Sequence, residues 1–221
     1  MNEAERCAEQ MKNKGILIVI SGFSGAGKGT LVKRLLQKYD NYALSISMTT
    51  RQPREGERDG VEYFFRDKEQ FEATIAQNGL IEYACYCGNY YGTPKAYVEE
   101  QLEAGKDVIL EIEIQGALKV KEQFPESLLL FVTPPSAAEL ERRLVGRGTE
   151  SMEVIRKRLA RASEESEGIE AYDYIVVNDV LDVCVDEVHH LVDAARRAPV
   201  RREAFIKEIR EELKGFAKGA E

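Results

Sequence analysis

The stretch ILIVISGFSGAGKGT, residues 16–30, decides the fold of this chain. Residues 16–20 are apolar on both faces of a strand, which is typical of a parallel strand covered by helices. Residues 28–39 then carry leucines at helical spacing, which indicates a helix. The loop between them fits G-x-x-x-x-G-K, and a position after a strand and before a helix is what a phosphate-binding P-loop requires. The stretch predicts a nucleotide-binding α/β fold.

The chemistry of this loop is that of a phosphate cradle. Its glycines let backbone N–H groups close around phosphate oxygens at the positive end of the helix dipole, and Lys28 adds a charge for the β- and γ-phosphates. Gly29 stands where such loops usually carry the Ser or Thr that holds Mg²⁺, and Thr30 follows. We therefore expect no direct metal ligand, with Mg²⁺ held by phosphates and water near Thr30 and Glu111. Glu111 and Glu113 end a buried strand and are candidates to orient those waters.

The strand–helix pattern recurs along the chain. Further buried strands are expected at 108–110, 128–132 and 174–177, and helices at 116–123 and 180–195. Strands that alternate with helices indicate an α/β fold, in which a P-loop-type parallel sheet is flanked by helices.

Two further segments add to this sheet. Residues 45–105 are rich in Tyr, Gly, Arg and Thr with short strand-like pieces, and we interpret them as a small mixed α+β insertion. Ser136 and Glu139 follow two prolines in a capping-box pattern, which predicts the start of a helix.

Polar residues inside the insertion predict where a second substrate binds. Arg51 and Arg54 lie three apart in a polar loop, where two guanidinium groups can clamp one phosphate, and Tyr63 and Tyr91 can add hydroxyl donors. Glu82 ends a short apolar stretch. A carboxylate accepts the two adjacent donors on the Watson–Crick edge of guanine, whereas adenine presents an acceptor there. We therefore interpret Glu82 as a selector for guanine.

Composition limits the remaining function classes. The 221 residues carry 31 Lys and Arg against 39 Asp and Glu, a net charge of −8, which argues against broad binding to nucleic acid or to an anionic membrane. No apolar run is long enough for a membrane span, and the first 14 residues lack the apolar core of a secretory signal. Cys7, Cys85, Cys87 and Cys184 do not have zinc spacing, so we expect reduced thiols in a cytoplasmic protein.

The two ends differ in character from the middle. Residues 1–14 form a polar leader with the pattern of a short helix at most, and residues 201–221 form a helical extension. Apolar side chains in the extension have helical spacing: Ala204, Phe205, Ile209, Leu213 and Phe216. We expect this helix to dock on the domain, and a contact with a partner or a second copy is the alternative.

Six motifs together carry a resemblance to a known family. These are SGFSGAGKGT, SISMTTRQPR, EGERDGVEY, GNYYGT, EIEIQG and RLVGRGTE. The resemblance is to guanylate kinases, and it runs from about Ile16 to Leu191 in the order and spacing of that family. The resemblance implies Mg²⁺- and ATP-dependent phosphorylation of GMP, and also of dGMP, within purine nucleotide metabolism. It implies a domain over 15–200, with a GMP-binding insertion over about 45–105 and a lid over about 136–168.

The resemblance also implies roles for individual residues. The ATP-binding set is Ser24, Gly25, Ala26, Gly27, Lys28, Gly29, Thr30, Arg143 and Asn178. The GMP-binding set is Ser47, Arg51, Arg54, Tyr63, Glu82, Tyr91, Thr93, Glu111 and Glu113. The catalytic set, which offsets the charge of the transferred phosphoryl group, is Lys28, Arg51, Arg143, Arg147 and Arg158. Glu111 and Glu113 stand where some members of the family have Asp.

Three alternatives stay open at this point. One is a kinase of the same fold with another acceptor, such as AMP, a pyrimidine monophosphate or a phosphorylated sugar. Another is a binding module without activity, against which the presence of Lys28, Arg51 and Arg54 argues. The third is nucleic-acid binding through the tail, whose mixed charges disfavour it. The sequence leaves monomer and homo-oligomer equally open.

Overall fold

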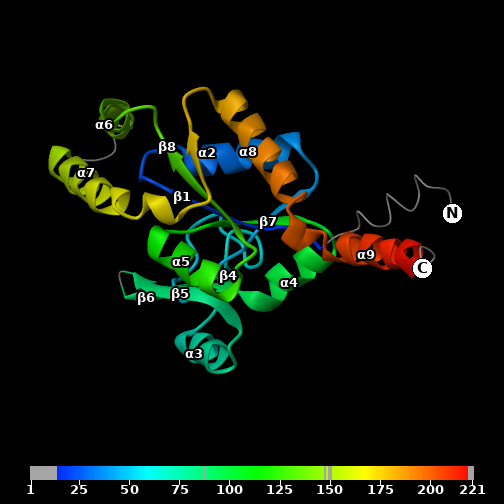
Figure 1. The fold of residues 1–221 in the computed structure, drawn as a ribbon. Helices are drawn as coiled ribbons and strands as arrows, with labels where there is room; N and C mark the ends of the chain where they lie inside the picture. Colours follow the sequence, from blue (N-terminus) through cyan, green and yellow to red (C-terminus); the bar gives the residue numbers. More distant parts are fainter. Residues whose placement is uncertain (1–13, 87, 147, 149–150, 219–221) are drawn as a thin grey trace.

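A five-stranded parallel sheet forms the core of the computed structural model, which describes residues 14–86, 88–146, 148 and 151–218 (Figure 1). Its strand order is β2-β7-β1-β8-β9, and every neighbouring pair is parallel. The strands are β2 Tyr42–Leu44, β7 Asp107–Glu111, β1 Leu17–Gly22, β8 Leu128–Thr133 and β9 Tyr174–Val177. The predicted α/β fold is confirmed.

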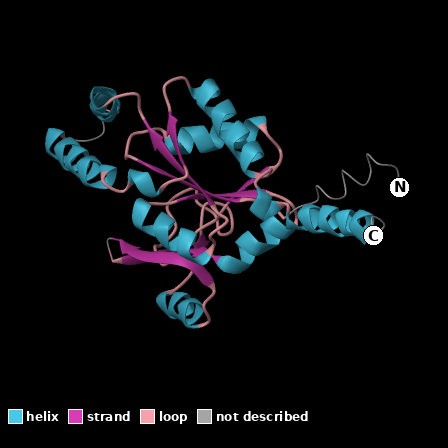
Figure 2. Cartoon of the chain, in the orientation of Figure 1, coloured by secondary structure: helices cyan, strands magenta, loops and turns pink. Residues whose placement is uncertain are grey.

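Helices cover both faces of this sheet (Figure 2). One face packs against α2 Lys28–Lys38 and α8 Leu181–Ala195, and the other against α4 Lys95–Glu103 and α5 Ile114–Gln123. The central strand β1 shows why both layers are needed. Ile18 and Ile20 point into the first layer while Val19 points into the second, and all three are fully buried.

A smaller, mixed sheet lies beside the core, in the order β4-β3-β6-β5. Its strands are β4 Phe64–Phe65, β3 Met48–Thr49, β6 Asn89–Pro94 and β5 Leu80–Tyr86, and α3 Lys68–Ala76 accompanies them. This unit spans 48–94, which is shorter than the expected 45–105. The difference arises because α4 buries Val98 and Leu102 against the main sheet and belongs to the core.

Two helices form a third unit above the carboxyl edge of the sheet. They are α6 Ala137–Gly146 and α7 Met152–Ser166, and they share a small apolar cluster that includes Leu144 and Ile155. The predicted start at Ser136 is confirmed, because its Oγ accepts the backbone N–H of Glu139 at 3.1 Å.

The C-terminal part contains the short 3₁₀ turns η1 Ile169–Ala171 and η2 Pro199–Arg201, and then α9 Glu203–Lys218. In Figure 1, α9 runs away from both sheets. Its apolar stripe is exposed and not docked on the domain, since Phe216 is 79% and Leu213 60% exposed.

The expectations about membrane spans and about the cysteines can be compared with the structure for the described residues only. Across the described residues, every helix is too short or too polar to cross a membrane. Cys85 and Cys184 have free thiols, the latter in the core, whereas Cys7 and Cys87 lie outside the described residues, as do all positions of the leader except Lys14.

Candidate active site

The P-loop joins the carboxyl end of β1 to the start of α2. Gly27 caps α2 with φ of 91°, a conformation that favours glycine, and a Cβ there would lie 2.6 Å from Nδ2 of Asn178. Because glycine has no side chain to cap the helix, the N–H groups of the first turn are available to an anion. The ammonium of Lys28 donates to the carbonyls of Gly22 at 2.7 Å and Phe23 at 3.3 Å, which keeps it at the mouth of the loop.

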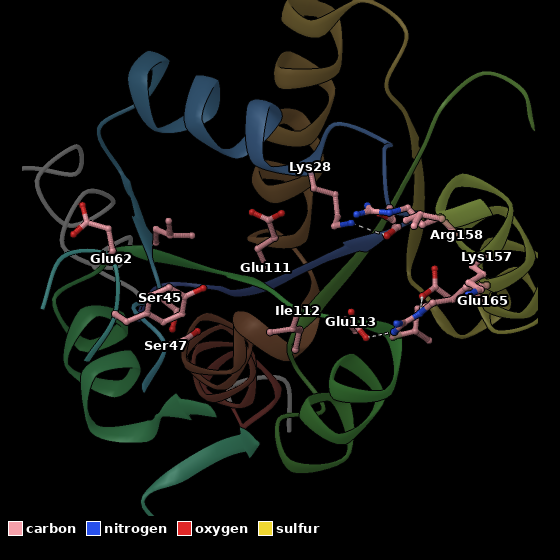
Figure 3. A pocket seen from close by; sticks show the side chains of 17 residues that line it. Lys28, Ser45, Ser47, Glu62, Glu111, Ile112, Glu113, Lys157, Arg158 and Glu165 are labelled. Atoms are coloured by element: carbon pink, nitrogen blue, oxygen red, sulfur yellow. Dashed lines mark hydrogen bonds and ion pairs between the residues drawn. The ribbon is translucent and has the colours of Figure 1, made fainter. Parts of the chain in front are cut away.

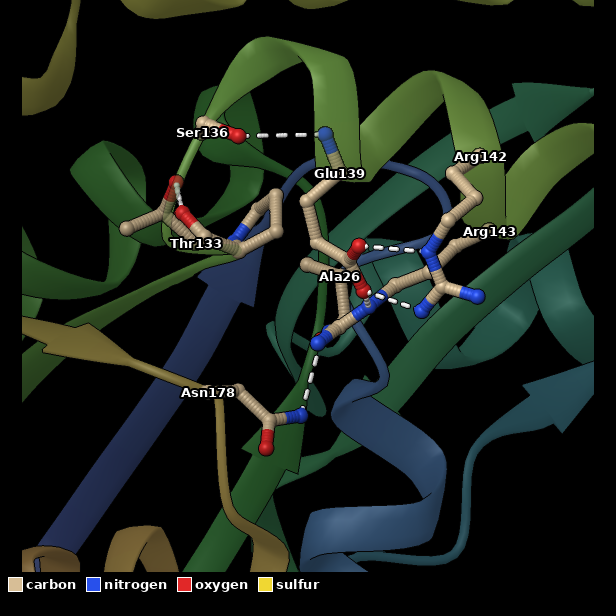
Figure 4. Close-up of polar contacts among 8 residues, drawn as sticks. Ala26, Thr133, Ser136, Glu139, Arg142, Arg143 and Asn178 are labelled. Carbon is tan, nitrogen blue, oxygen red and sulfur yellow. Dashed lines mark hydrogen bonds and ion pairs between the residues drawn. The ribbon is translucent and has the colours of Figure 1, made fainter.

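Two side chains from elsewhere in the chain hold the loop from behind (Figure 4). The carbonyl of Ala26 accepts Nδ2 of Asn178 at 2.8 Å and NH1 of Arg143 at 3.4 Å. Arg143 also donates Nε to Glu139 at 2.7 Å, and Arg142 donates to the same carboxylate, whose pKa these two hydrogen bonds lower to about 2. Asn178 and Arg143 therefore meet the P-loop, the part of the site to which the sequence assigned them.

A cavity of about 870 Å³ opens beside the loop, large enough for nucleotide-sized ligands. In Figure 3 the side chains of the P-loop and of α7 lie on one side of it, and those from the region before β3 lie on the other, with Glu111 between them. The cavity brings together seven residues that the sequence predicts: Ser24, Lys28, Ser47, Tyr63, Glu111, Glu113 and Arg158.

Five further polar residues line this cavity and escaped prediction: Ser45, Glu62, Lys157, Arg161 and Glu165. Ser45 is the most informative, because its Oγ is buried and has no hydrogen-bond partner among the described residues. Ser45 stands two residues before Ser47, and residues two apart in an extended chain point to the same side. This spacing could have predicted that Ser45 lines the same cavity as Ser47. Arg161 follows Arg158 at helical spacing, which also placed it on the same face.

Helix α7 contributes arginines that reach across to the core. Arg158 donates to Oγ of Ser24 at 2.6 Å, which joins the helix to the P-loop. Arg161 pairs with Glu113, the N-cap residue of α5, and donates Nε to Glu165 at 2.9 Å. Arg147, which the sequence also assigned to this set, lies outside the described residues.

The carboxylate of Glu111 lies close to Gly29 of the P-loop. A Cβ built on Gly29 would lie 3.7 Å from Oε2 of Glu111, so this carboxylate stands beside the place that a Ser or Thr would occupy. Surrounding protein raises the pKa of Glu111 even though solvent reaches its side chain, and the charge of Lys28 lowers that pKa in part. Among the described residues, no three Asp, Glu, His or Cys side chains gather into a metal cage. The residues present fit an ion held mainly by phosphates and water.

Arg51 lies in a cluster of the smaller sheet. Its NH2 donates to both oxygens of Glu57 at 2.9 and 3.0 Å, and its guanidinium lies 5.3 Å from the ring centre of Tyr63. The rings of Tyr63 and Tyr91 are 6.1 Å apart. Arg54 donates its backbone N–H to Glu57 at 2.8 Å and has an exposed side chain. The structure thus brings Arg51, Tyr63 and Tyr91 together, with Glu57 as a partner that the sequence did not predict.

Glu82 and Thr93 come from the antiparallel strands β5 and β6. The hydroxyl of Thr93 donates to Oε1 of Glu82 at 2.7 Å. Burial raises the pKa of Glu82, while the Thr93 hydrogen bond and the charge of Lys119 lower it in part. A Cβ on Gly116 would lie 3.5 Å from Oε2, so Glu82 reaches from the smaller sheet toward the start of α5.

Comparison with known proteins decides the family. Residues 14–195 match the model of a family described as guanylate kinase. The chain belongs to the guanylate kinase family. It is 52% identical to a guanylate kinase from Desulfitobacterium hafniense over 88% of this chain and 97% of that protein. It is 55% identical to one from Halalkalibacterium halodurans over 83% and 90%. A crystal structure of guanylate kinase from Anaplasma phagocytophilum superposes with a TM-score of 0.68 at 32% identity, covering 87% of this chain and 92% of the other.

Guanylate kinases are phosphotransferases, and this member is therefore an enzyme. The match extends through the P-loop, the smaller sheet and the α6–α7 unit but ends before η2 and α9.

Proposed function

We propose that this enzyme transfers the γ-phosphoryl group of ATP to GMP, and also to dGMP, and releases ADP and GDP or dGDP. One observation carries the proposal: a single cavity is lined by the P-loop residues Ser24 and Lys28 and, on its other side, by Ser47 and Tyr63. A donor phosphate on the loop would therefore face an acceptor held by the smaller sheet. The names of the curated relatives support the same reaction.

On the donor side, the triphosphate rests on the N-terminus of α2. Backbone N–H groups of the loop and the ammonium of Lys28 bind its β- and γ-phosphates. Arg158 and Arg143 already contact Ser24 and the Ala26 carbonyl, so both guanidinium groups lie within reach of this phosphate site. Arg147 joins them in the proposal on the strength of the sequence alone.

On the acceptor side, the phosphate of GMP binds the Arg51, Tyr63 and Tyr91 cluster, with Arg54 at its edge. Glu82 and Thr93 read the guanine base: the Glu82 carboxylate accepts N1–H and the 2-amino group, and Thr93 holds one of its oxygens in place. Ser45 is a further candidate contact, because its buried hydroxyl faces the cavity without a partner in the described chain.

The transfer needs positioning and charge compensation more than covalent chemistry. A phosphate oxygen of GMP is already anionic, so it attacks the γ-phosphorus without a general base. The bond from that phosphorus to the oxygen it shares with the β-phosphate breaks, and ADP leaves with the electron pair. Lys28 and the arginines stabilise the charge shared during the transfer, and no covalent intermediate on the enzyme forms.

Magnesium would enter with ATP. Glu111, beside Gly29, and Thr30 are the residues that would hold its water shell, and the ion would supply charge neutralisation between the phosphates. Residues of this chain provide the remaining charge, since Lys28, Arg143 and Arg158 come from three different elements around one site.

Product analysis tests the proposal. The enzyme is incubated with ATP, Mg²⁺ and GMP, and all nucleotides are separated and quantified over time. We expect ADP and GDP to appear in equal amounts, and no ADP to form when GMP is omitted. Formation of ADP without GDP, or no turnover by folded protein, would contradict the proposal.

A further inference from the structure

Two arginines on helix α7 each contact the body of the enzyme. Arg158 donates through NH1 to Oγ of Ser24 at 2.6 Å, and Arg161 pairs through NH2 with Oε2 of Glu113. Residues three apart are neighbours on the surface of a helix, so both guanidinium groups leave α7 on the same face. Helix α7 is therefore held at two points, about one turn apart along its length.

The two partners stand at equivalent places on neighbouring strands. Ser24 lies two residues after the end of β1, and Glu113 lies two residues after the end of β7. These strands are parallel neighbours in the core sheet. Neighbouring strands are about 4.8 Å apart, and three residues of a helix rise about 4.5 Å. The spacing of the two arginines thus matches the spacing of the two strand ends that they contact.

A second carboxylate orients Arg161. Oε1 of Glu165, one turn further along α7, accepts Nε of Arg161 at 2.9 Å. This bond directs one edge of the planar guanidinium to its own helix and leaves NH2 for Glu113. In Figure 3 a dashed line joins Glu113 to a side chain of α7 at the edge of the cavity. The contact between α7 and the end of β7 is therefore directional.

The pair between Arg161 and Glu113 is too exposed to add much to stability. The two side chains are 51% and 73% exposed, and ion pairs at such exposure contribute little to the free energy of unfolding. The pair can nevertheless determine where α7 lies. A displacement of about 1 Å in a group that acts on the reacting centre can lower a rate by about 10²-fold.

We propose that Arg161 is a positioning residue, which holds α7 across the ends of β1 and β7 and thereby keeps Arg158 at the P-loop. The inference rests on the proposed function, because that function places Arg158 at the phosphates of ATP. Arg161 itself does not need to touch either nucleotide. Its effect on phosphoryl transfer passes through Arg158.

Direct binding of a nucleotide by Arg161 is the alternative, since its side chain also lines the cavity. Two of its three guanidinium nitrogens, Nε and NH2, already donate to carboxylates, and these two anions offset its single positive charge. Both observations favour the positioning role. The two roles also differ in their kinetics, because direct binding predicts a raised KM, whereas action through Arg158 predicts a lowered kcat.

A double-mutant cycle tests the route through Arg158. In Arg161→Gln we expect kcat to fall by about tenfold and the KM values for ATP and GMP to stay within about twofold. Arg161→Lys, which keeps a charge opposite Glu113, should recover at least half of the lost kcat. In the background of Arg158→Met, Arg161→Gln should have no further effect, because the residue through which it acts is absent.

The control for this cycle is Arg156→Gln. Arg156 is an exposed cation of α7, and the described residues that line the cavity do not include it. We expect wild-type kcat in this variant. The proposal would be overturned by wild-type kcat in Arg161→Gln, by a raised KM without loss of kcat, or by a tenfold loss that persists in the Arg158→Met background.

Hydrogen exchange without nucleotides gives a readout that does not depend on the proposed function. We expect amides of α7 to exchange several-fold faster in Arg161→Gln than in the wild-type enzyme, and at the wild-type rate in Arg156→Gln, because the helix opens more easily once the contact with Glu113 is lost. Unchanged exchange in Arg161→Gln would overturn the proposal even if the enzyme phosphorylates GMP. Failure of the wild-type enzyme to form GDP would instead contradict the proposed function, and the exchange rates would still decide whether Arg161 holds α7.

Discussion

The hydroxyl of Thr93 donates a 2.7 Å hydrogen bond to the carboxylate of Glu82, and the two residues come from neighbouring antiparallel strands. The bond fixes one oxygen of a partly buried acidic group between the smaller sheet and α5. A carboxylate held in this way is a rigid acceptor for two adjacent donors, which is the pattern that guanine presents.

The first prediction concerns this carboxylate. Glu82→Gln keeps the shape but replaces one acceptor with a donor, so kcat/KM for GMP should fall by about 10- to 100-fold, corresponding to about 1–3 kcal/mol for an unsatisfied buried group. Because the lost interaction is specific to the guanine base, the ratio of kcat/KM for GMP to kcat/KM for AMP should fall by the same factor. Glu72→Gln, an exposed position on α3, is the control. An unchanged preference in Glu82→Gln would exclude it as the base selector.

A second prediction follows from pH. Burial raises the pKa of Glu82 above its usual range, so this group takes up a proton at a higher pH than an ordinary carboxyl. In the proposed binding mode the ionised carboxylate accepts from guanine, so kcat/KM for GMP should decrease as pH falls through the raised pKa. The KM for ATP should change less over the same window. A GMP profile as flat as that of Glu82→Gln would show that Glu82 does not titrate during binding.

The third prediction concerns the P-loop ammonium. Lys28→Met should lower kcat by about 10²- to 10³-fold, since it removes a charge that stabilises the transferred phosphoryl group. The KM for GMP should change far less, because the proposed acceptor site lies on the smaller sheet. Lys33→Met, on the exposed side of α2, should retain full kcat. Steady-state kinetics distinguish these results, provided that each variant unfolds at the same temperature as the wild-type enzyme. A normal kcat in Lys28→Met would reject the P-loop assignment.

The fourth prediction separates charge from geometry at Arg51. Its planar guanidinium makes two hydrogen bonds to Glu57 and lies near the Tyr63 ring, which a lysine cannot reproduce. Arg51→Lys should raise the KM for GMP by about tenfold and leave the KM for ATP within about twofold. Arg66→Lys, at a half-exposed ion pair with Asp59, is the matched control. Equal effects on both substrates would place Arg51 outside the GMP site.

The fifth prediction concerns stability. Asp107 is fully buried and accepts from the backbone of Ile16 at 2.9 Å, from Asn41 at 2.7 Å and from Arg196. Asp107→Ala leaves these donors unpaired and should reduce the free energy of unfolding by about 3–5 kcal/mol. Asp182→Ala, which breaks the exposed pair with Arg34, should hardly change the unfolding temperature. Urea unfolding of both variants provides the comparison, and similar midpoints would contradict the account of Asp107.

The parts that the sequence predicts well are those set by local pattern. Strand β1, the P-loop and α2 need only a buried run, glycines and helical spacing, and all three lie within 16–39. Helix α3 begins with a capping box, in which Asp67 accepts the N–H of Gln70 at 2.7 Å. This motif is also a local pattern of residue types, so the start of α3 was predictable from the sequence as well.

The parts that escaped prediction depend on contacts between distant residues. Strand β2 is three residues long and gains its place only by pairing with β7. Arg161 and Glu113 are 48 residues apart and meet because α7 crosses the carboxyl edge of the sheet. The periodicity of a single segment does not predict a contact between such distant residues. The full set of polar residues that line the cavity could therefore be identified only from the structure.

The most direct test of the central claim is the initial rate of ADP formation with ATP, Mg²⁺ and each of GMP, dGMP, AMP, CMP, UMP and dTMP. The account predicts efficient turnover with GMP and dGMP alone, because it assigns recognition of the guanine edge to Glu82, which Thr93 holds by a hydrogen bond. Comparable kcat/KM with AMP or a pyrimidine monophosphate would contradict it.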